Sequence, residues 1–288
     1  MIIRLVVFLL VATSAWTQPL PKSLLWKITS ANGSVSHIFG TIHIQDSAVF
    51  RQRDTVLQLI RQCKAYASEM HLDSVATMMQ PSMLFLKSST LYDVLDTGQV
   101  RRICAVLNER VPGMGALCSR MKPGAIGMLI SFGSMERTAD VAMDLFLWSL
   151  AKKSRATLIG LESLQEQLAI IDDMTADMLV EHIDQLPRED SLALILPKLY
   201  ADEDLTGLAS LTEDTTEAYS GMIERINDDR NVLMVDRMQP LLRNGGAFIA
   251  IGALHLTGSK SILQLLKQRG YRIEAVTGGR RSQWLEGQ

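Results

Sequence analysis

Two histidines follow a glycine in the same way near opposite ends of the chain. His43 ends the stretch Phe39-Gly-Thr-Ile-His43, and His255 ends the stretch Gly252-Ala-Leu-His255. In both, a run of apolar, β-favouring residues leads into the glycine, which is typical of a buried parallel strand. Ligands of open α/β sheets bind at the carboxyl ends of such strands. We therefore expect the two imidazoles to converge on one site.

Two further apolar runs end in a carboxylate. Residues 64–69 end in Glu69 and residues 156–162 end in Glu162, so four predicted strands end in His, Glu, Glu and His. Two imidazoles and two carboxylates at one sheet edge match the ligands of a divalent cation of the Mn, Fe, Co and Zn group. The alternative is that each terminal residue separately caps a helix or faces solvent.

The segments before Glu69 must deliver the first histidine. Residues 23–28 and 36–41 predict two strands, and the turn signal Asn32-Gly33 lies between them. We therefore expect a β-hairpin that leads directly to His43. Apolar spacing over residues 47–63 predicts a helix after it.

The character of the chain changes after residue 72. Strand patterns are missing from residues 72–153, helical spacing dominates and methionines are frequent. The last helix expected in this stretch, residues 138–153, carries Asp144. We interpret the stretch as a helical insertion that forms a cap. Its methionines are more often adaptable core filler than a ligand surface.

A second helical stretch covers residues 163–243. Pro187 predicts a break between helices over residues 174–186 and 188–200. Further on, the pair Arg230-Asn231 belongs to a polar cluster that precedes an apolar helix face. If it points into a cleft, the guanidinium could hold a carboxylate or stabilise developing negative charge. The alternative is a solvated helix face with ordinary charge pairs.

The chain closes on another strand and helix pattern. We expect a strand over residues 248–252, a helix over residues 259–269 with Gly270 as its C-cap, and a strand over residues 271–276. Together the elements predict an α/β (α+β) fold. Its central mixed sheet would carry large helical insertions that form a cap over the strand-end cleft.

Composition excludes some classes of function. The chain has 288 residues, of which 47% are hydrophobic and 21% charged, with a net charge of −2. This is enough for one large domain with a real core, which we place at residues 22–288. The near-neutral balance and the lack of a basic run argue against a nucleic-acid partner.

The N-terminus reads as a secretory signal peptide over residues 1–17. Arg4 supplies the positive charge, an apolar run follows it, and Thr13-Ser-Ala15 resembles a cleavage site. The run is shorter than the roughly 20 residues that cross a bilayer. We therefore expect a periplasmic or secreted protein with no stable membrane span after cleavage. The alternative is a retained N-terminal anchor.

Three cysteines give a weaker signal. A bridge between Cys104 and Cys118 is sterically conceivable, but the preferred interpretation is that these two and Cys63 are small buried hydrophobes. None has neighbours that would lower a thiol pKa, so we do not expect a cysteine nucleophile.

These residues together resemble the TraB/GumN family, which includes the Tiki-type metalloproteases. The resemblance runs from about Leu25 to Val276. The residues that carry it are Trp26, Phe39-Gly-Thr-Ile-His43, Glu69, Asp144, Gly160-Leu-Glu162 with Glu166-Gln167, Arg230-Asn231, and Gly252-Ala-Leu-His255-Leu with Gly258.

The resemblance implies a set of roles. His43 and His255 would be metal ligands, with Glu162 or else Glu69 as a third. The remaining glutamate would move a proton, and Arg230 would stabilise an oxyanion or bind a substrate carboxylate. Glu69, Glu162 and Arg230 are thus the predicted catalytic residues. Tiki-type members imply Mn or Co rather than Zn.

The leading hypothesis is an exported metal-dependent hydrolase, in the first place a peptidase, that acts on a peptide or protein substrate. Two alternatives stay open. One is metal-free hydrolysis by a histidine beside the glutamates. The other is a non-catalytic periplasmic protein that binds a ligand in the cleft.

Overall fold

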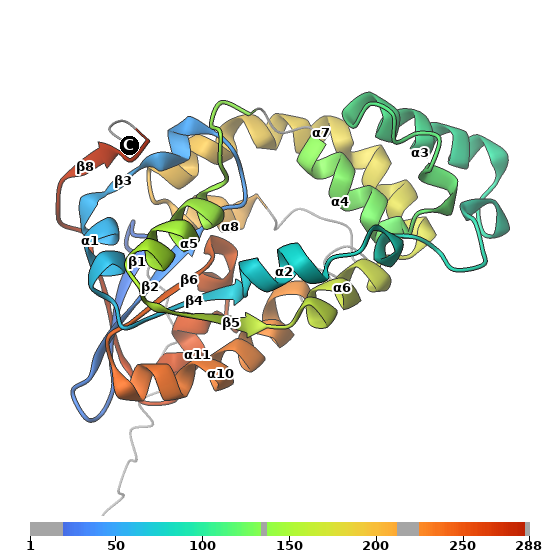
Figure 1. The fold of residues 1–288 in the computed structure, drawn as a ribbon. Coiled ribbons are helices and arrows are strands. Elements are labelled where there is room, and N and C mark those ends of the chain that lie inside the picture. The colour runs from blue at the N-terminus through green and yellow to red at the C-terminus, as the bar shows by residue number, and fades with distance from the viewer. Residues whose placement is uncertain (1–19, 134–136, 212–224, 286–288) are drawn as a thin grey trace, which may run out of the picture.

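Parallel strands bring the four predicted strand-end residues to one edge of a central sheet. The computed structural model in Figure 1 describes residues 20–133, 137–211 and 225–285. The sheet has the order β5-β4-β6-β2-β1-β7. Strands β2, β4, β5 and β6 are parallel, whereas β1 pairs antiparallel with β2 and β7. The strands are β1 (Leu25–Thr29), β2 (Val35–Thr41), β4 (Ala65–Met70), β5 (Thr157–Glu162), β6 (Ala247–Gly252) and β7 (Arg272–Ala275).

Helices cover both faces of this sheet, so the predicted α/β fold with a mixed sheet is confirmed. In Figure 1, α1 (Asp54–Gln62) and α5 (Met143–Lys153) lie on one face, and α10 (Arg230–Asn244) and α11 (Ile262–Gln268) lie on the other. Strand β6 is apolar up to its final glycine because both of its faces are covered. Its Phe248 ring stacks on Tyr66 of β4 with centroids 6.0 Å apart.

The helices between β4 and β5 divide into two groups. α2 (Leu72–Met78) leads from β4 to α3 (Thr97–Arg110) and α4 (Pro123–Gly133), which lie in a lobe at the far right of Figure 1. The lobe has its own hydrophobic core, to which the first half of α7 (Ala176–Ala201) contributes. The last helix of the stretch, α5, packs instead on β4, β5 and α1. The segment after β5 therefore returns to the lobe through α6 (Leu164–Asp173), which contacts α4.

The predicted single helix over residues 47–63 is wrong. The chain forms a 3-10 turn (Ser47–Phe50), then the short strand β3 (Arg51–Arg53), and only then α1. β3 pairs with β8 (Arg281–Gln283), a strand that the sequence patterns did not indicate. The cause is a buried ion pair: Arg53 Nε lies 2.9 Å from Glu203, which also binds Arg281 at 2.8 Å. Such distant contacts override local helical spacing.

The predicted break at Pro187 is also wrong, because α7 is continuous through it. A proline removes one backbone donor and strains the preceding turn. The helix persists because it is anchored on both sides, with Leu186 in the core of the lobe and Tyr200 in the core of the sheet. The helix before Gly270 has Arg269 as its C-cap, so the predicted cap is one residue off. Gly270 follows it with a φ of +86°, the left-handed position that favours glycine after a helix.

Several predictions concern the ends and the surface. The predicted signal peptide, residues 1–17, lies outside the described residues. No described helix combines the length and the apolar character that crossing a bilayer requires.

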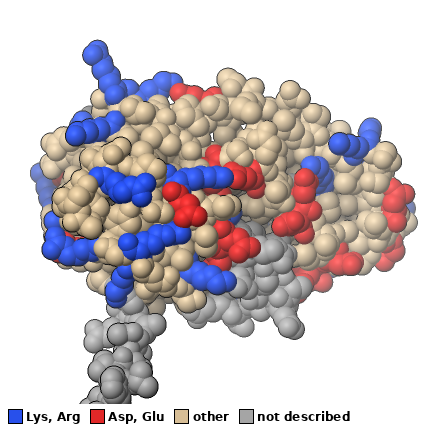
Figure 2. Space-filling view, turned by 90° about the horizontal axis from the view of Figure 1, so that it is seen from below, with Lys and Arg blue, Asp and Glu red and all other residues tan. Residues whose placement is uncertain are grey.

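Figure 2 shows one face, on which Lys and Arg gather over the sheet end and Asp and Glu gather toward the lobe. This face therefore carries both signs of charge.

The cysteine interpretation needs a correction. Cys104 of α3 and Cys118 of the following 3-10 turn (Cys118–Arg120) form a disulfide within the lobe, with Cα atoms 5.4 Å apart. Only the third cysteine keeps the predicted role. Cys63 is half-buried and free, and burial raises the pKa of its thiol to about 11, so it is not an activated nucleophile.

Removing the disulfide should destabilise the lobe. The bridge spans 14 residues, and closing a loop of that size in the unfolded chain contributes about 3 kcal/mol. We expect the double variant Cys104→Ala/Cys118→Ala to lose about that much free energy of unfolding in urea. The matched control Cys63→Ala should lose clearly less, since it breaks no cross-link. Equal losses, or three alkylatable thiols in the unreduced protein, would contradict the bridge.

Candidate functional site

Four neighbouring segments deliver the ionisable side chains. His43 follows β2, Glu69 stands near the end of β4, Glu162 ends β5, and His255 lies in a 3-10 turn (Ala253–Leu256) after β6. Because β5, β4, β6 and β2 are adjacent and parallel, their carboxyl ends share one edge. The structure therefore brings His43, Glu69 and His255 close together. Glu162 lies beside them and is linked to Glu69 through Arg230. Arg230 joins them from the first turn of α10.

Each histidine is oriented by a hydrogen bond at its Nδ1 atom. His43 Nδ1 lies 2.7 Å from Oδ2 of Asp144, which α5 supplies, and Thr41 donates to the other carboxylate oxygen of Asp144 at 2.5 Å. His255 Nδ1 lies 2.7 Å from Oδ1 of Asn231 on α10. The amide nitrogen of Asn231 donates to the Lys260 carbonyl, so its oxygen faces the ring. Both acceptors favour the Nδ1–H tautomer, which leaves the lone pair on Nε2.

The two Nε2 atoms face the same carboxylate oxygen. Oε1 of Glu69 lies 3.9 Å from His43 Nε2 and 3.6 Å from His255 Nε2. The same oxygen accepts a hydrogen bond from the Gly252 backbone at 2.7 Å. The second oxygen, Oε2, accepts from Arg230 at 2.8 Å. Glu69 is thus held rigidly between the two imidazoles.

Glu162 has a different environment from the one predicted. Arg230 donates to Oε1 through Nε at 2.8 Å and to Oε2 through Nη2 at 2.6 Å, and Gln167 donates to Oε2 at 2.8 Å. Both oxygens are therefore engaged in a buried fork-shaped pair. The contacts make Glu69, rather than Glu162, the carboxylate that faces the histidines. Arg230 does hold carboxylates, but they are those of the protein itself.

The cluster sets unequal proton affinities. The Asp144 carboxylate raises the pKa of His43, although water screens part of the effect because 53% of that side chain is exposed. Burial lowers the pKa of His255 to about 4. Burial disfavours the ionised form of Glu69, but His255, His43 and Arg230 outweigh it and lower its pKa to about 2. At neutral pH, His255 is therefore neutral and Glu69 is ionised.

The described residues contain no group of three or more His, Cys, Asp or Glu side chains in the arrangement of a preformed metal site. The donors at the sheet edge nevertheless match in type, because two Nε2 lone pairs and an ionised carboxylate suit Mn, Co or Zn. Two ligands at about 2.1 Å from a tetrahedral ion lie about 3.4 Å apart. The observed separations of 3.6 and 3.9 Å are slightly wider.

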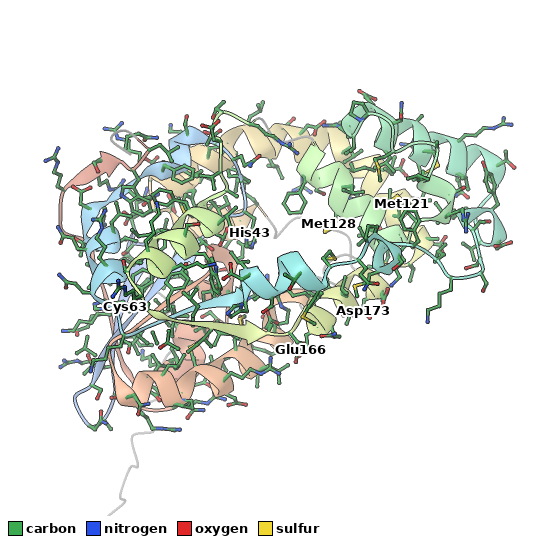
Figure 3. The ribbon with its side chains drawn as sticks, viewed as in Figure 1. His43, Cys63, Met121, Met128, Glu166 and Asp173 are labelled. Atoms are coloured by element: carbon green, nitrogen blue, oxygen red, sulfur yellow. A yellow bond between two sulfur atoms is a disulfide. The ribbon has the colours of Figure 1, made fainter. Side chains whose placement is uncertain are left out.

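A cavity of about 580 Å³ adjoins these residues and extends from the sheet edge toward the lobe. His43, Glu69, Arg230 and His255 lie on its sheet side. Figure 3 shows Met128 of α4 across this space from His43.

A neighbouring histidine, His71, does not join the site. It caps α2, and its ring packs edge-on against Trp148 with ring centroids 4.8 Å apart.

Sequence reasoning gave no role to Asp144, Asn231 or Gln167, although the first two orient the histidines and the third holds Glu162. The one signal in the sequence was that all three residues are among those that carry the family resemblance. Nothing in their spacing showed which side chain each would meet, since all three contacts join elements that are distant in sequence.

Comparison with known proteins adds one finding. The model of the TraB/PrgY/gumN family matches residues 24–275. No curated protein and no solved structure matches the chain.

Arg230 should matter for stability far more than a surface arginine. In Arg230→Met, Glu69 and Glu162 lose the cation they share, and breaking a buried pair costs about 3–5 kcal/mol. The matched control is Arg237→Met, whose partner Glu166 is 35% exposed and whose loss should cost about 1 kcal/mol or less. Urea unfolding at neutral pH measures both. Equal losses would show that the buried cluster does not depend on Arg230.

The metal-free protein should lose stability in mild acid. The folded-state pKa of His255 is about 4 against an ordinary value of 6.5, so folding favours its neutral form. That contribution is complete above pH 6.5 and is lost as the pH falls toward 4. Unfolding measured in chelator across this window should be less pH-dependent for His255→Gln than for the unmodified chain.

His37 provides the comparison for this experiment. Burial also lowers the pKa of His37, but His37 lies near the start of β2, whereas the cluster gathers at the carboxyl end of that strand. A His37→Gln variant should therefore keep the part of the slope that belongs to His255. An unchanged slope in His255→Gln would mean that this imidazole is not held neutral.

Proposed function

The chain belongs to the TraB/PrgY/gumN family, and on that premise we propose that it is an exported metal-dependent hydrolase that cleaves amide bonds, peptide bonds among them. One observation carries the proposal: two imidazoles with anchored Nδ1 atoms turn their Nε2 atoms toward one oxygen of Glu69 at the mouth of a cavity. A site with three protein donors leaves positions for water and substrate, as catalytic metal sites do.

His43, His255 and Glu69 would hold the ion, with Glu69 in place of the Glu162 ligand expected from sequence. A bound divalent ion polarises a carbonyl and makes water acidic enough to attack at neutral pH. Asp144 and Asn231 act as positioning residues, because they set the tautomer and the direction of each imidazole. Export is proposed from the N-terminal sequence, residues 1–17.

Arg230 and Glu162 would hold Glu69 in place without binding the ion themselves. Their bidentate pair fixes the guanidinium, and the guanidinium in turn fixes Glu69 in its ionised form. Arg230 also lines the cavity. Its positive charge is therefore near the carbonyl oxygen on which negative charge develops during hydrolysis.

Metal-free hydrolysis is the second candidate, and a specific observation favours it. His43 and Asp144 form a short hydrogen bond of 2.7 Å, and the half-exposed side chain of His43 lines the cavity. In this arrangement His43 would take the proton of the attacking water, and Asp144 would stabilise the imidazolium.

A metal-reconstitution assay tests the proposal. The protein is treated with chelator, then given Mn, Co or Zn, while a library of quenched fluorescent peptides reports cleavage and calorimetry reports metal binding. We expect turnover only with metal. His43→Ala and Glu69→Ala should each lower kcat/KM at least about 100-fold, because each removes a donor to the ion. His37→Ala, which alters a histidine outside the cluster, should retain activity.

The other outcomes assign the site differently. Turnover that resists the chelator but disappears in His43→Ala and Asp144→Asn would establish the metal-free mechanism. A folded protein that binds no metal and cleaves nothing would leave only a binding role for the cleft.

A further inference from the structure

The cavity beside the sheet edge has two unlike ends. Among the lining residues that the structure describes, the ionisable side chains are His43, Glu69, Arg230 and His255, and all of them lie on the sheet side. The remaining wall is mostly apolar, and much of it comes from four helices: α4, α6, α7 and α8 (Leu205–Ser210). The segments that follow β2 and β6 add Ile42 and Leu254. The helical part of the wall includes Met128, Phe132, Ile170, Leu192, Leu196 and Leu208. A charged group in this part of the cavity would lose hydration without finding a partner there.

Three polar side chains of the wall are already engaged with other side chains, and Asn227 is a fourth polar residue that lines it. Thr41 donates to Asp144, Gln167 donates to Glu162, and Ser131 lies 3.5 Å from the His182 ring. Each residue of a bound peptide brings one backbone donor and one acceptor that need partners when buried. An alkyl chain brings none. The described wall therefore suits a hydrocarbon better than a stretch of peptide.

The size of the cavity is compatible with such an occupant. Its volume of about 580 Å³ falls in the range of roughly 300–1,000 Å³ that encloses drug-sized ligands. It exceeds what one amino-acid side chain fills. Phe132 at the wall is 42% exposed, so apolar surface is available to an occupant.

From these observations we propose that the cavity binds a long apolar acyl chain, and that the bond hydrolysed is the amide joining this chain to an amine. The proposal rests on the hydrolase function above, because it places the acyl carbonyl at the histidines and Glu69. The chain would extend from there between α4 and α7. Water adds to the acyl carbonyl, the C–N bond breaks, and the products are a carboxylic acid and a free amine.

Acyl-chain length gives the first test. Coumarin amides with acetyl, butanoyl, octanoyl and dodecanoyl groups are compared with coumarin amides of short peptides ending in Leu or Phe. Burying each added methylene favours the longer chain, so kcat/KM should rise at least about 100-fold from acetyl to octanoyl. Octanoyl amides should also exceed the peptidyl ones. A preference for the peptidyl amides, or no dependence on length, would overturn the proposal.

A matched pair of variants on α7 locates the chain. Leu192 lines the cavity, so Leu192→Trp should fill it and remove the advantage of the octanoyl and dodecanoyl amides. Leu194 is 83% exposed and is not among the residues of the cavity wall. Leu194→Trp should therefore keep the full dependence on chain length. The same loss in both variants would show that the chain does not lie in this cavity.

Binding separates this proposal from the hydrolase function. Calorimetry with octanamide and acetamide on the His43→Ala variant needs no turnover. Octanamide should bind, acetamide should bind at least about 100-fold more weakly, and Leu192→Trp added to this variant should abolish octanamide binding. Binding without turnover of any amide by the unmodified protein would support the cavity assignment and reject the hydrolase. No octanamide binding would reject the acyl chain even if peptides are cleaved.

Discussion

The site depends on one guanidinium that holds two buried carboxylates together. Glu69 and Glu162 end neighbouring strands, and both side chains are largely withdrawn from water. Two such anions would repel one another without a cation between them. Arg230 supplies that cation, and Nη2 contacts both carboxylates. Its position follows from the packing of α10, whose buried Met234 and Val235 fix the helix against the sheet.

The orientation of the histidines extends this dependence to both helical layers. Asp144, which holds His43, belongs to α5 on one face of the sheet, and Asn231, which holds His255, belongs to α10 on the other. The imidazoles are therefore aimed from opposite sides of the same edge. A displacement of either helix would turn one Nε2 atom away from Glu69. The site thus requires the whole layered core, rather than a single loop.

The lobe contributes another kind of surface. Its hydrophobic core is separate from that of the sheet, and the disulfide lies within it. The long helix α7 joins the two cores, since Leu179 belongs to one and Tyr200 to the other. The sheet edge and the first turn of α10 supply the ionisable groups of the cavity, and helices supply most of its apolar wall. Under the proposed function, the sheet edge would carry out the hydrolysis and the helices would select the substrate.

The sequence by itself determined the six strands of the central sheet and the candidate site residue at the carboxyl end of four of them. Apolar runs that end in His43, Glu69, Glu162 and His255 require buried strands, and parallel strands necessarily present their carboxyl ends together. Only the tertiary structure decided which groups meet. Glu69 faces the histidines and Glu162 binds Arg230, although both end similar strands, because the choice depends on where α10 places its guanidinium. Contacts between separate segments also decide the β3–β8 pairing, the unbroken α7 and the disulfide. Local periodicity in the sequence carries no information about such contacts.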